Sequence, residues 1–100
     1  MTEMQMVLIV CDAGVTHRVK EIIDEAGAPG YTVLQDATGK GESGPRENTP
    51  IWPGLNSVVL CAVPSHCVPR IREGLDVLRK QRSARHLPLK MFVWNLDEIG

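Results

Sequence analysis

The feature that most limits the fold is an apolar run near the N-terminus, Met-Gln-Met-Val-Leu-Ile-Val-Cys, at residues 4–11. Apart from Gln5, its side chains are apolar at both odd and even positions, which predicts a β-strand that is covered on both faces. Asp12 follows directly and is a candidate for a helix N-cap. A strand of this kind belongs inside a sheet, so the rest of the chain must supply neighbouring strands and a covering layer for each face.

The remaining segments alternate between helical and extended patterns. Apolar residues recur at helical spacing over residues 15–26 and 65–78, whereas residues 31–35, 55–63 and 89–95 are rich in strand formers. The resulting order, β-α-β-loop-β-α-β, predicts an α+β ferredoxin-like βαββαβ fold with both helices on one face of the sheet. Because the strands are apolar on their other face as well, we expect that face to be buried between subunits.

Composition restricts the classes of function. One hundred residues predict a single domain spanning residues 1–100, and a net charge of −1 argues against binding to nucleic acid through overall positive charge. No apolar run approaches the roughly 20 residues that cross a bilayer, so we expect no membrane insertion. Three cysteines and no recognisable leader argue against a secreted disulfide scaffold, which makes a cytoplasmic location the expectation.

A long polar loop interrupts the extended segments at residues 37–54. It contains the sequence Gly-Lys-Gly-Glu-Ser-Gly at residues 39–44. Glycines let backbone N–H groups turn toward an anion, and Lys40 adds a positive charge. The spacing matches neither the P-loop nor the dinucleotide-binding pattern, so a flexible surface loop without a ligand is the alternative. Loops of this length inside a small domain are usually functional or disordered.

Basic side chains gather at the end of the second predicted helix and just beyond it: Arg79, Lys80, Arg82, Arg85, His86 and Lys90. Cations near a helix C-terminus are favourable without any ligand, which accounts for the first three. Lys90 differs because it stands among apolar strand residues, where a charge needs a partner. Either a carboxylate or a phosphate would serve as that partner.

Cys61, His66 and Cys67 are candidates for a metal site or, in the case of the two thiols, for a redox pair. Their spacing matches no structural zinc pattern, and buried cysteines often act as small apolar residues. Asp12 with His17 could be an acid–base pair, but both fit a helix cap and a solvated helix face. With no nucleophile elbow or zinc-protease pattern present, the sequence predicts no enzyme, no catalytic residues, no metal site and no resident cofactor.

Together these features resemble the PII-like signalling proteins. The matching segments are residues 30–33 at the entry to the second strand, 39–41 at the start of the loop, 63–64 before the second helix and 90–93 in the last strand. The compact Gly-Glu-Ser-Gly-Pro loop is most similar to the carboxysome-associated PII branch. The resemblance implies a homotrimer that binds adenine nucleotides in clefts between subunits, together with bicarbonate, and a signalling loop known in that family as the T-loop.

The resemblance also implies roles for individual residues. Nucleotide binding would involve Thr32, Gly39, Lys40, Gly41, Ala62, Val63 and Lys90. Arg85 joins this set because of its charge and position. Bicarbonate would contact the loop at Lys40, Glu42, Ser43 and Arg46. The glycines that PII proteins carry before the last strand and the basic residues that they carry after it are missing here, so we expect ADP or AMP to bind better than ATP.

The implied function is regulatory. The loop would order over its ligands and signal inorganic-carbon or energy status to a partner protein that the sequence does not identify. The implied location is cytoplasmic, with an association with carboxysomes. Two alternatives stay open on the same scaffold: a slow nucleotide hydrolase in which Glu42 or Glu47 positions water, and a divalent-metal-binding trimer of the copper-tolerance type.

Overall fold

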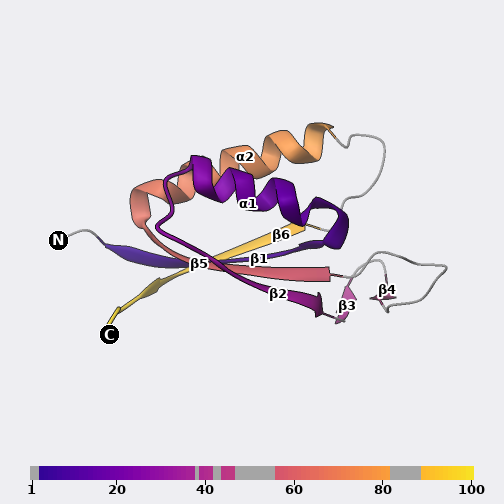
Figure 1. Cartoon of the computed structure of the whole chain (residues 1–100), viewed down its shortest axis with the longest axis horizontal. Coiled ribbons are helices and arrows are strands. Elements are labelled where there is room, and N and C mark those ends of the chain that lie inside the picture. Colours follow the sequence, from indigo (N-terminus) through magenta and orange to yellow (C-terminus); the bar gives the residue numbers. More distant parts are fainter. Residues whose placement is uncertain (1–2, 38, 42–43, 47–55, 82–88) are drawn as a thin grey trace.

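The computed structural model describes residues 3–37, 39–41, 44–46, 56–81 and 89–100. Its elements are, in chain order, β1 (Met4–Asp12), α1 (Thr16–Glu25), β2 (Thr32–Ala37), β3 (Gly39–Gly41), β4 (Gly44–Arg46), β5 (Asn56–Pro64), α2 (Val68–Gln81) and β6 (Leu89–Leu96) (Figure 1). Short 3-10 turns, η1 (Ala13–Val15) and η2 (Ser65–Cys67), lead into the two helices. The predicted α+β order is confirmed, with the long strands and both helices where the sequence places them.

β1 is an interior strand of a four-stranded sheet whose order is β2-β5-β1-β6, and every neighbouring pair is antiparallel. Leu8, near the middle of β1, stands opposite Leu60 on β5 and Phe92 on β6. This is the ferredoxin-like arrangement. The apolar run near the N-terminus therefore occupies the interior position that its two-sided apolar pattern predicts.

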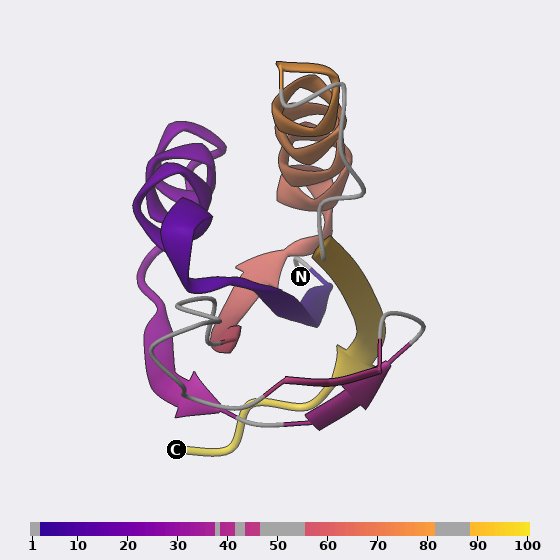
Figure 2. The ribbon, with the colours of Figure 1, turned by 90° about the vertical axis from the view of Figure 1, so that its right-hand side faces the viewer.

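Both helices lie on one side of the sheet, and Figure 2, turned by 90° from Figure 1, shows no helix of the described chain on the other side. The core joins odd-numbered strand residues to the inner faces of the helices: Val7, Ile9, Val59, Val63, Val19, Ile23, Ile71 and Leu75. Neither helix of the described chain is long and apolar enough to span a membrane. The core uses one face of each strand and leaves the other face without a helix layer.

The even-numbered strand positions form this second face, which we call the open face: Leu34 on β2, Val58, Leu60 and Ala62 on β5, Met6, Leu8 and Val10 on β1, and Phe92 and Trp94 on β6. Phe92 is 53% exposed and Trp94 is 46% exposed. Large contiguous apolar patches on soluble proteins usually mark interaction sites. That other subunits cover the open face stays a prediction at this point.

The predicted loop at residues 37–54 is more structured at its start than its sequence suggests. Ala37 still belongs to β2, and residues 39–41 and 44–46 pair as a separate antiparallel hairpin, β3–β4. The sequence does not predict this hairpin, because half of its six strand residues are glycine, which is depleted in strands. The rest of the loop lies outside the described residues.

The two helices pack closely at Gly74 on α2. A Cβ atom at this position would lie 2.5 Å from Cγ2 of Ile22 on α1 and 3.2 Å from its Cγ1. Ile22 is β-branched and buried, so it has little freedom to turn away. Alanine has a helix propensity about 1 kcal/mol better than glycine. Even so, we expect Gly74→Ala to destabilise the fold by about 1 kcal/mol, since overpacking costs about 1–3 kcal/mol.

Chemical denaturation of Gly74→Ala measures this effect. In an Ile22→Ala background the clash is gone, so there the same substitution should become stabilising through helix propensity alone. Glu73→Ala, at the exposed neighbouring position, is the control for changes in α2 that add no buried atom. A Gly74→Ala single variant as stable as the wild type would show that the glycine has no packing role.

Candidate functional site

The chain leaves the sheet at the end of β2, where the predicted ligand loop begins. The pairing of β2 with β5 shifts between Leu34 and Ala37, which marks a β-bulge. The bulge contains Asp36, whose φ of 59° lies in the left-handed region. Aspartate tolerates that conformation better than most residues because its side chain can bond to nearby backbone groups. Bulges bend a strand, and this one precedes the β3–β4 hairpin.

The hairpin brings two basic residues of the predicted loop site onto neighbouring strands. Gly39 pairs with Arg46, and Lys40 is the next residue of β3. The backbones of Lys40 and Arg46 are therefore adjacent, in a two-stranded sheet that is separate from the main one. The remaining predicted loop contacts, Glu42 and Ser43, lie outside the described residues, as does Arg85.

Three predicted nucleotide contacts lie on β2 and β5. Thr32 begins β2 opposite Leu60 and is exposed on the open face. Ala62 is on the same face, where it pairs with Met6 of β1. Val63 points the other way, and its side chain is 0% exposed in the core. Only the main chain of Val63 is therefore available to a ligand.

Lys90 lies at the opposite edge of the sheet. It stands on β6 opposite Val10 of β1, with an exposed side chain on the open-face side. Adjacent strands are about 4.8 Å apart, so the three steps from β6 to β2 amount to about 14 Å. Thr32 and Lys90 thus face the same side but from opposite edges of the sheet.

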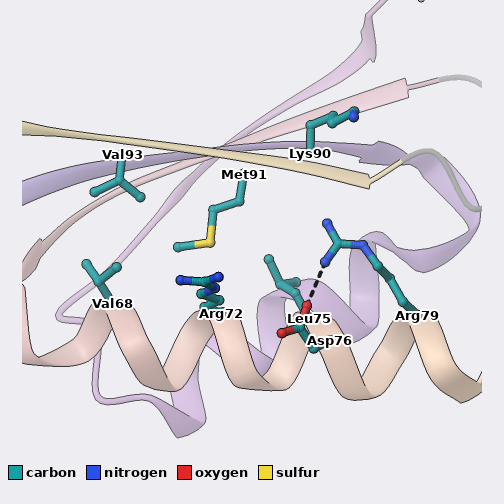
Figure 3. A pocket seen from close by; sticks show the side chains of 8 residues that line it. All are labelled: Val68, Arg72, Leu75, Asp76, Arg79, Lys90, Met91 and Val93. Carbon is teal, nitrogen blue, oxygen red and sulfur yellow. Dashed lines mark hydrogen bonds and ion pairs between the residues drawn. The ribbon is translucent and has the colours of Figure 1, made fainter. Parts of the chain in front are cut away.

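A hollow of about 610 Å³ lies between α2 and β6, lined by Val68, Arg72, Leu75, Asp76, Arg79, Lys90, Met91 and Val93. We call it the α2–β6 groove. Figure 3 shows Met91 and Val93 pointing from β6 toward α2, with Arg72 rising from the helix beside them. Lys90 borders the groove, but its side chain lies on the other side of β6 (Figure 3). The groove is therefore apolar at its floor and charged along the helix, where Arg72 and Arg79 outnumber Asp76.

Arg79 ties the end of α2 to the first residue of β6. Its Nη1 donates to Oδ1 of Asp76 at 2.8 Å, and its Nη2 donates to the carbonyl oxygen of Leu89 at 2.9 Å. Arg79 therefore has a structural role that needs no ligand. The groove is not predicted from the sequence, although the seven-residue spacing of Arg72 and Arg79 places them on one side of a helix and is a signal for it.

The three cysteines are free and buried. Burial raises the pKa of Cys11 and, with a smaller contribution from the neighbouring Cys67 thiol, raises the pKa of Cys61 from 9.0 to about 11. Thiolate is the reactive and metal-binding form, so Cys11 and Cys61 are poorly suited to fast redox chemistry. Among the described residues, no group of three or more His, Cys, Asp and Glu side chains could hold a metal ion.

The raised pKa of Cys61 predicts how stability depends on pH. The folded chain favours the neutral thiol, so this contribution is fully present below pH 9.0 and is lost as the pH rises through about 11. We expect the free energy of unfolding to fall across this range, and to fall less steeply in Cys61→Ala. Urea denaturation at several pH values gives both slopes. Equal slopes would mean that Cys61 titrates alike in the folded and unfolded chains.

Comparison with known proteins places this fold in a family. The sequence model of nitrogen regulatory protein P-II matches residues 4–100. The chain belongs to the P-II family. This confirms the resemblance to PII-like proteins, and a homotrimer is consistent with membership of the family, whereas the carboxysome-associated branch stays a prediction. No curated protein was found whose sequence matches the chain.

Solved structures of P-II relatives share the fold. CPII from Thiomonas intermedia K12, a nitrogen regulatory PII-like protein bound to ADP, AMP and bicarbonate, has a TM-score of 0.72 at 20% identity over 93% of this chain and 87% of CPII. A PII-like signalling protein from Thermus thermophilus has a TM-score of 0.65 at 22% identity, covering 95% and 87% of the two chains. The B. subtilis GlnK–ATP complex has a TM-score of 0.66 at 17% identity, covering 96% of this chain and 84% of GlnK. At these identities the comparison establishes the fold.

Proposed function

We propose that this P-II family member is a non-enzymatic regulatory protein that forms a homotrimer and binds ADP or AMP in the clefts between its subunits. The observation that carries the proposal is the position of Thr32 and Lys90 at opposite edges of the open face. Each belongs to an edge strand of the sheet within the described chain. When copies close into a ring, the Lys90 edge of one copy meets the Thr32 edge of the next.

The two edges offer different chemistry to a nucleotide. Lys90 supplies a positive charge to a phosphate through charge-assisted hydrogen bonds. The other edge supplies the Thr32 hydroxyl and, beside it, the small side chain of Ala62, which leaves room for a base or ribose. A phosphate partner also accounts for a lysine within an apolar strand. The nucleotides bound to CPII, a relative of the same fold, support this class of ligand.

Bicarbonate is proposed to bind at the β3–β4 hairpin, where the backbones of Lys40 and Arg46 are adjacent. Fixing a loop costs roughly 1–2 kcal/mol of conformational entropy per residue. Two ligands that share the cost of fixing one loop bind cooperatively. The ordered loop then offers or withdraws a surface for a partner protein, which couples inorganic-carbon or energy status to that partner.

Calorimetric titration with AMP, ADP and ATP, each with and without bicarbonate, tests the proposal. We expect ADP and AMP to bind once per subunit and more tightly than ATP, and bicarbonate to raise their affinity. Chloride at equal ionic strength is the control for bicarbonate, because screening alone alters phosphate binding. A trimer that binds none of the three nucleotides would contradict the proposal. Steady ATP turnover would instead favour the hydrolase alternative.

A further inference from the structure

The α2–β6 groove lies on the helix side of β6, whereas the Lys90 side chain proposed to bind phosphate lies on the open-face side (Figure 3). The groove therefore has chemistry that the nucleotide cleft does not use. Arg79 is already held by Asp76 and by the backbone of β6. Arg72 is exposed and makes no hydrogen bond or ion pair within the described part of the chain. The guanidinium group of Arg72, beside the apolar floor, is thus available to bind a molecule in the groove.

The groove follows β6 on its helix side, where Met91 and Val93 line it, so it does not use the hydrogen-bonding edge of β6 that the proposed function gives to the next copy. A groove along a strand suits an extended segment with an apolar side chain for the floor and an acidic side chain for Arg72. A fully apolar segment would leave the guanidinium without a partner, and a basic one would be repelled.

The chain carries a segment with this chemistry directly after β6. Asp97 and Glu98 are exposed acidic residues, and Ile99 is 94% exposed. An isoleucine left in water forgoes the free energy that burial of its apolar surface provides. In Figure 1 the C-terminal segment leaves the sheet on the side opposite to α2, so it does not lie in the groove of its own chain.

We propose that residues 97–99 of one copy dock in the α2–β6 groove of a neighbouring copy. Ile99 packs on the floor beside Met91 and Val93, and the two acidic side chains lie within reach of Arg72. The match rests on charge complementarity and on an apolar side chain that nothing in its own described chain covers. The inference relies on the assembly part of the proposed function, since it needs two copies in contact, and it needs no nucleotide.

Disulfide cross-linking between two engineered cysteines tests the docking directly. One chain carries Ile99→Cys and another carries Val68→Cys, which lines the groove. The two chains are unfolded together, refolded as a mixture and oxidised mildly. A disulfide needs its two Cα atoms roughly 4.4–6.8 Å apart, so a covalent dimer of one chain of each kind should dominate a non-reducing gel. The native cysteines are buried and are present equally in every sample.

Two matched controls separate docking from random collision. Val77→Cys replaces Val68→Cys as the groove partner, since Val77 is 47% exposed on α2 but does not line the groove. Arg72→Glu should lower the yield of the Val68 cross-link about fivefold, the effect of about 1 kcal/mol at an exposed ion pair. Arg70→Glu, on the same helix outside the groove, should leave the yield unchanged.

The outcomes distinguish this inference from the proposed function. A trimer in light scattering that gives no Val68 cross-link, or gives as much with Val77→Cys, overturns the docking and leaves the nucleotide proposal intact. An unchanged yield in Arg72→Glu overturns the charge recognition. A protein that is monomeric throughout overturns both proposals, whereas a selective cross-link that persists without nucleotide supports the docking.

Discussion

Replacing Leu8 by glutamate is expected to convert the proposed trimer into monomers. Leu8 stands at the centre of the open face, between Leu60 on β5 and Phe92 on β6. If other copies cover this face, each Leu8→Glu chain brings a carboxylate into an apolar contact, where it loses its hydration without gaining a partner. Several kcal/mol per copy would weaken assembly by more than about a thousandfold, since each 1.4 kcal/mol is a factor of about ten. Size-exclusion chromatography with light scattering measures the result.

The matched control for Leu8→Glu is Val77→Glu. Val77 is also apolar and is 47% exposed, but it lies on α2, on the helix side of the sheet. This variant should remain a trimer. Circular dichroism should show that Leu8→Glu keeps its helices and strands, because the core is built from the odd-numbered strand positions. Phe92→Glu provides a second test at the same face. Trimers that survive both substitutions would show that the copies meet elsewhere.

The sequence predicts those features of the fold that depend on local periodicity. The two-sided apolar run of β1 predicts an interior strand, because the middle of a sheet is where both faces of a strand are most readily covered by other elements. Along β6, Met91 and Phe92 alternate between the helix side and the open face, as the strand pattern requires. Such patterns can be recognised in the sequence because the residues that form them are close together in the chain.

Features that depend on packing between distant segments are not visible in the sequence. The requirement for glycine at Gly74 comes from Ile22, which lies in another helix. The structural role of Arg79 comes from the carbonyl oxygen of Leu89 across the gap between α2 and β6. The bulge at Asp36 reflects the register of β2 against β5, which neither strand specifies alone.

The candidate site illustrates the same limit. Resemblance to the PII-like proteins selects Thr32 and Lys90 together, yet periodicity and charge do not show that they occupy opposite edges of one sheet. That fact comes only from the strand order. It turns a list of residues into a geometric requirement of the proposed function, in which one chain supplies the phosphate charge and another supplies the hydroxyl.

Lys90→Ala is expected to weaken ADP binding by more than about tenfold, because a hydrogen bond to a charged group contributes about 1.5–3 kcal/mol. Lys20→Ala is the matched control, since it removes the same charge from α1 on the helix side of the sheet. Calorimetric titration should show wild-type affinity for the control. Unchanged affinity in a trimeric Lys90→Ala protein would remove this residue from the site.

Mixed trimers test whether the site is shared between copies. Thr32→Glu should also abolish ADP binding, by placing a carboxylate at the other edge of the cleft. In a mixture of equal amounts of Lys90→Ala and Thr32→Glu chains, unfolded and refolded together, about one interface in four should combine an intact Lys90 with an intact Thr32. The mixture should therefore regain about a quarter of the wild-type binding capacity, at wild-type affinity.

Recovery of ADP binding in the mixture requires a site formed by two different chains, because neither chain alone carries both intact residues. Two residues that act from within one chain would give no recovery, because every chain in the mixture lacks one of them. Recovery must also vanish when both chains carry Leu8→Glu, since monomers have no interface at which Lys90 of one copy can meet Thr32 of another. Binding that returns in the mixture but persists in such monomers would contradict a cleft formed between subunits.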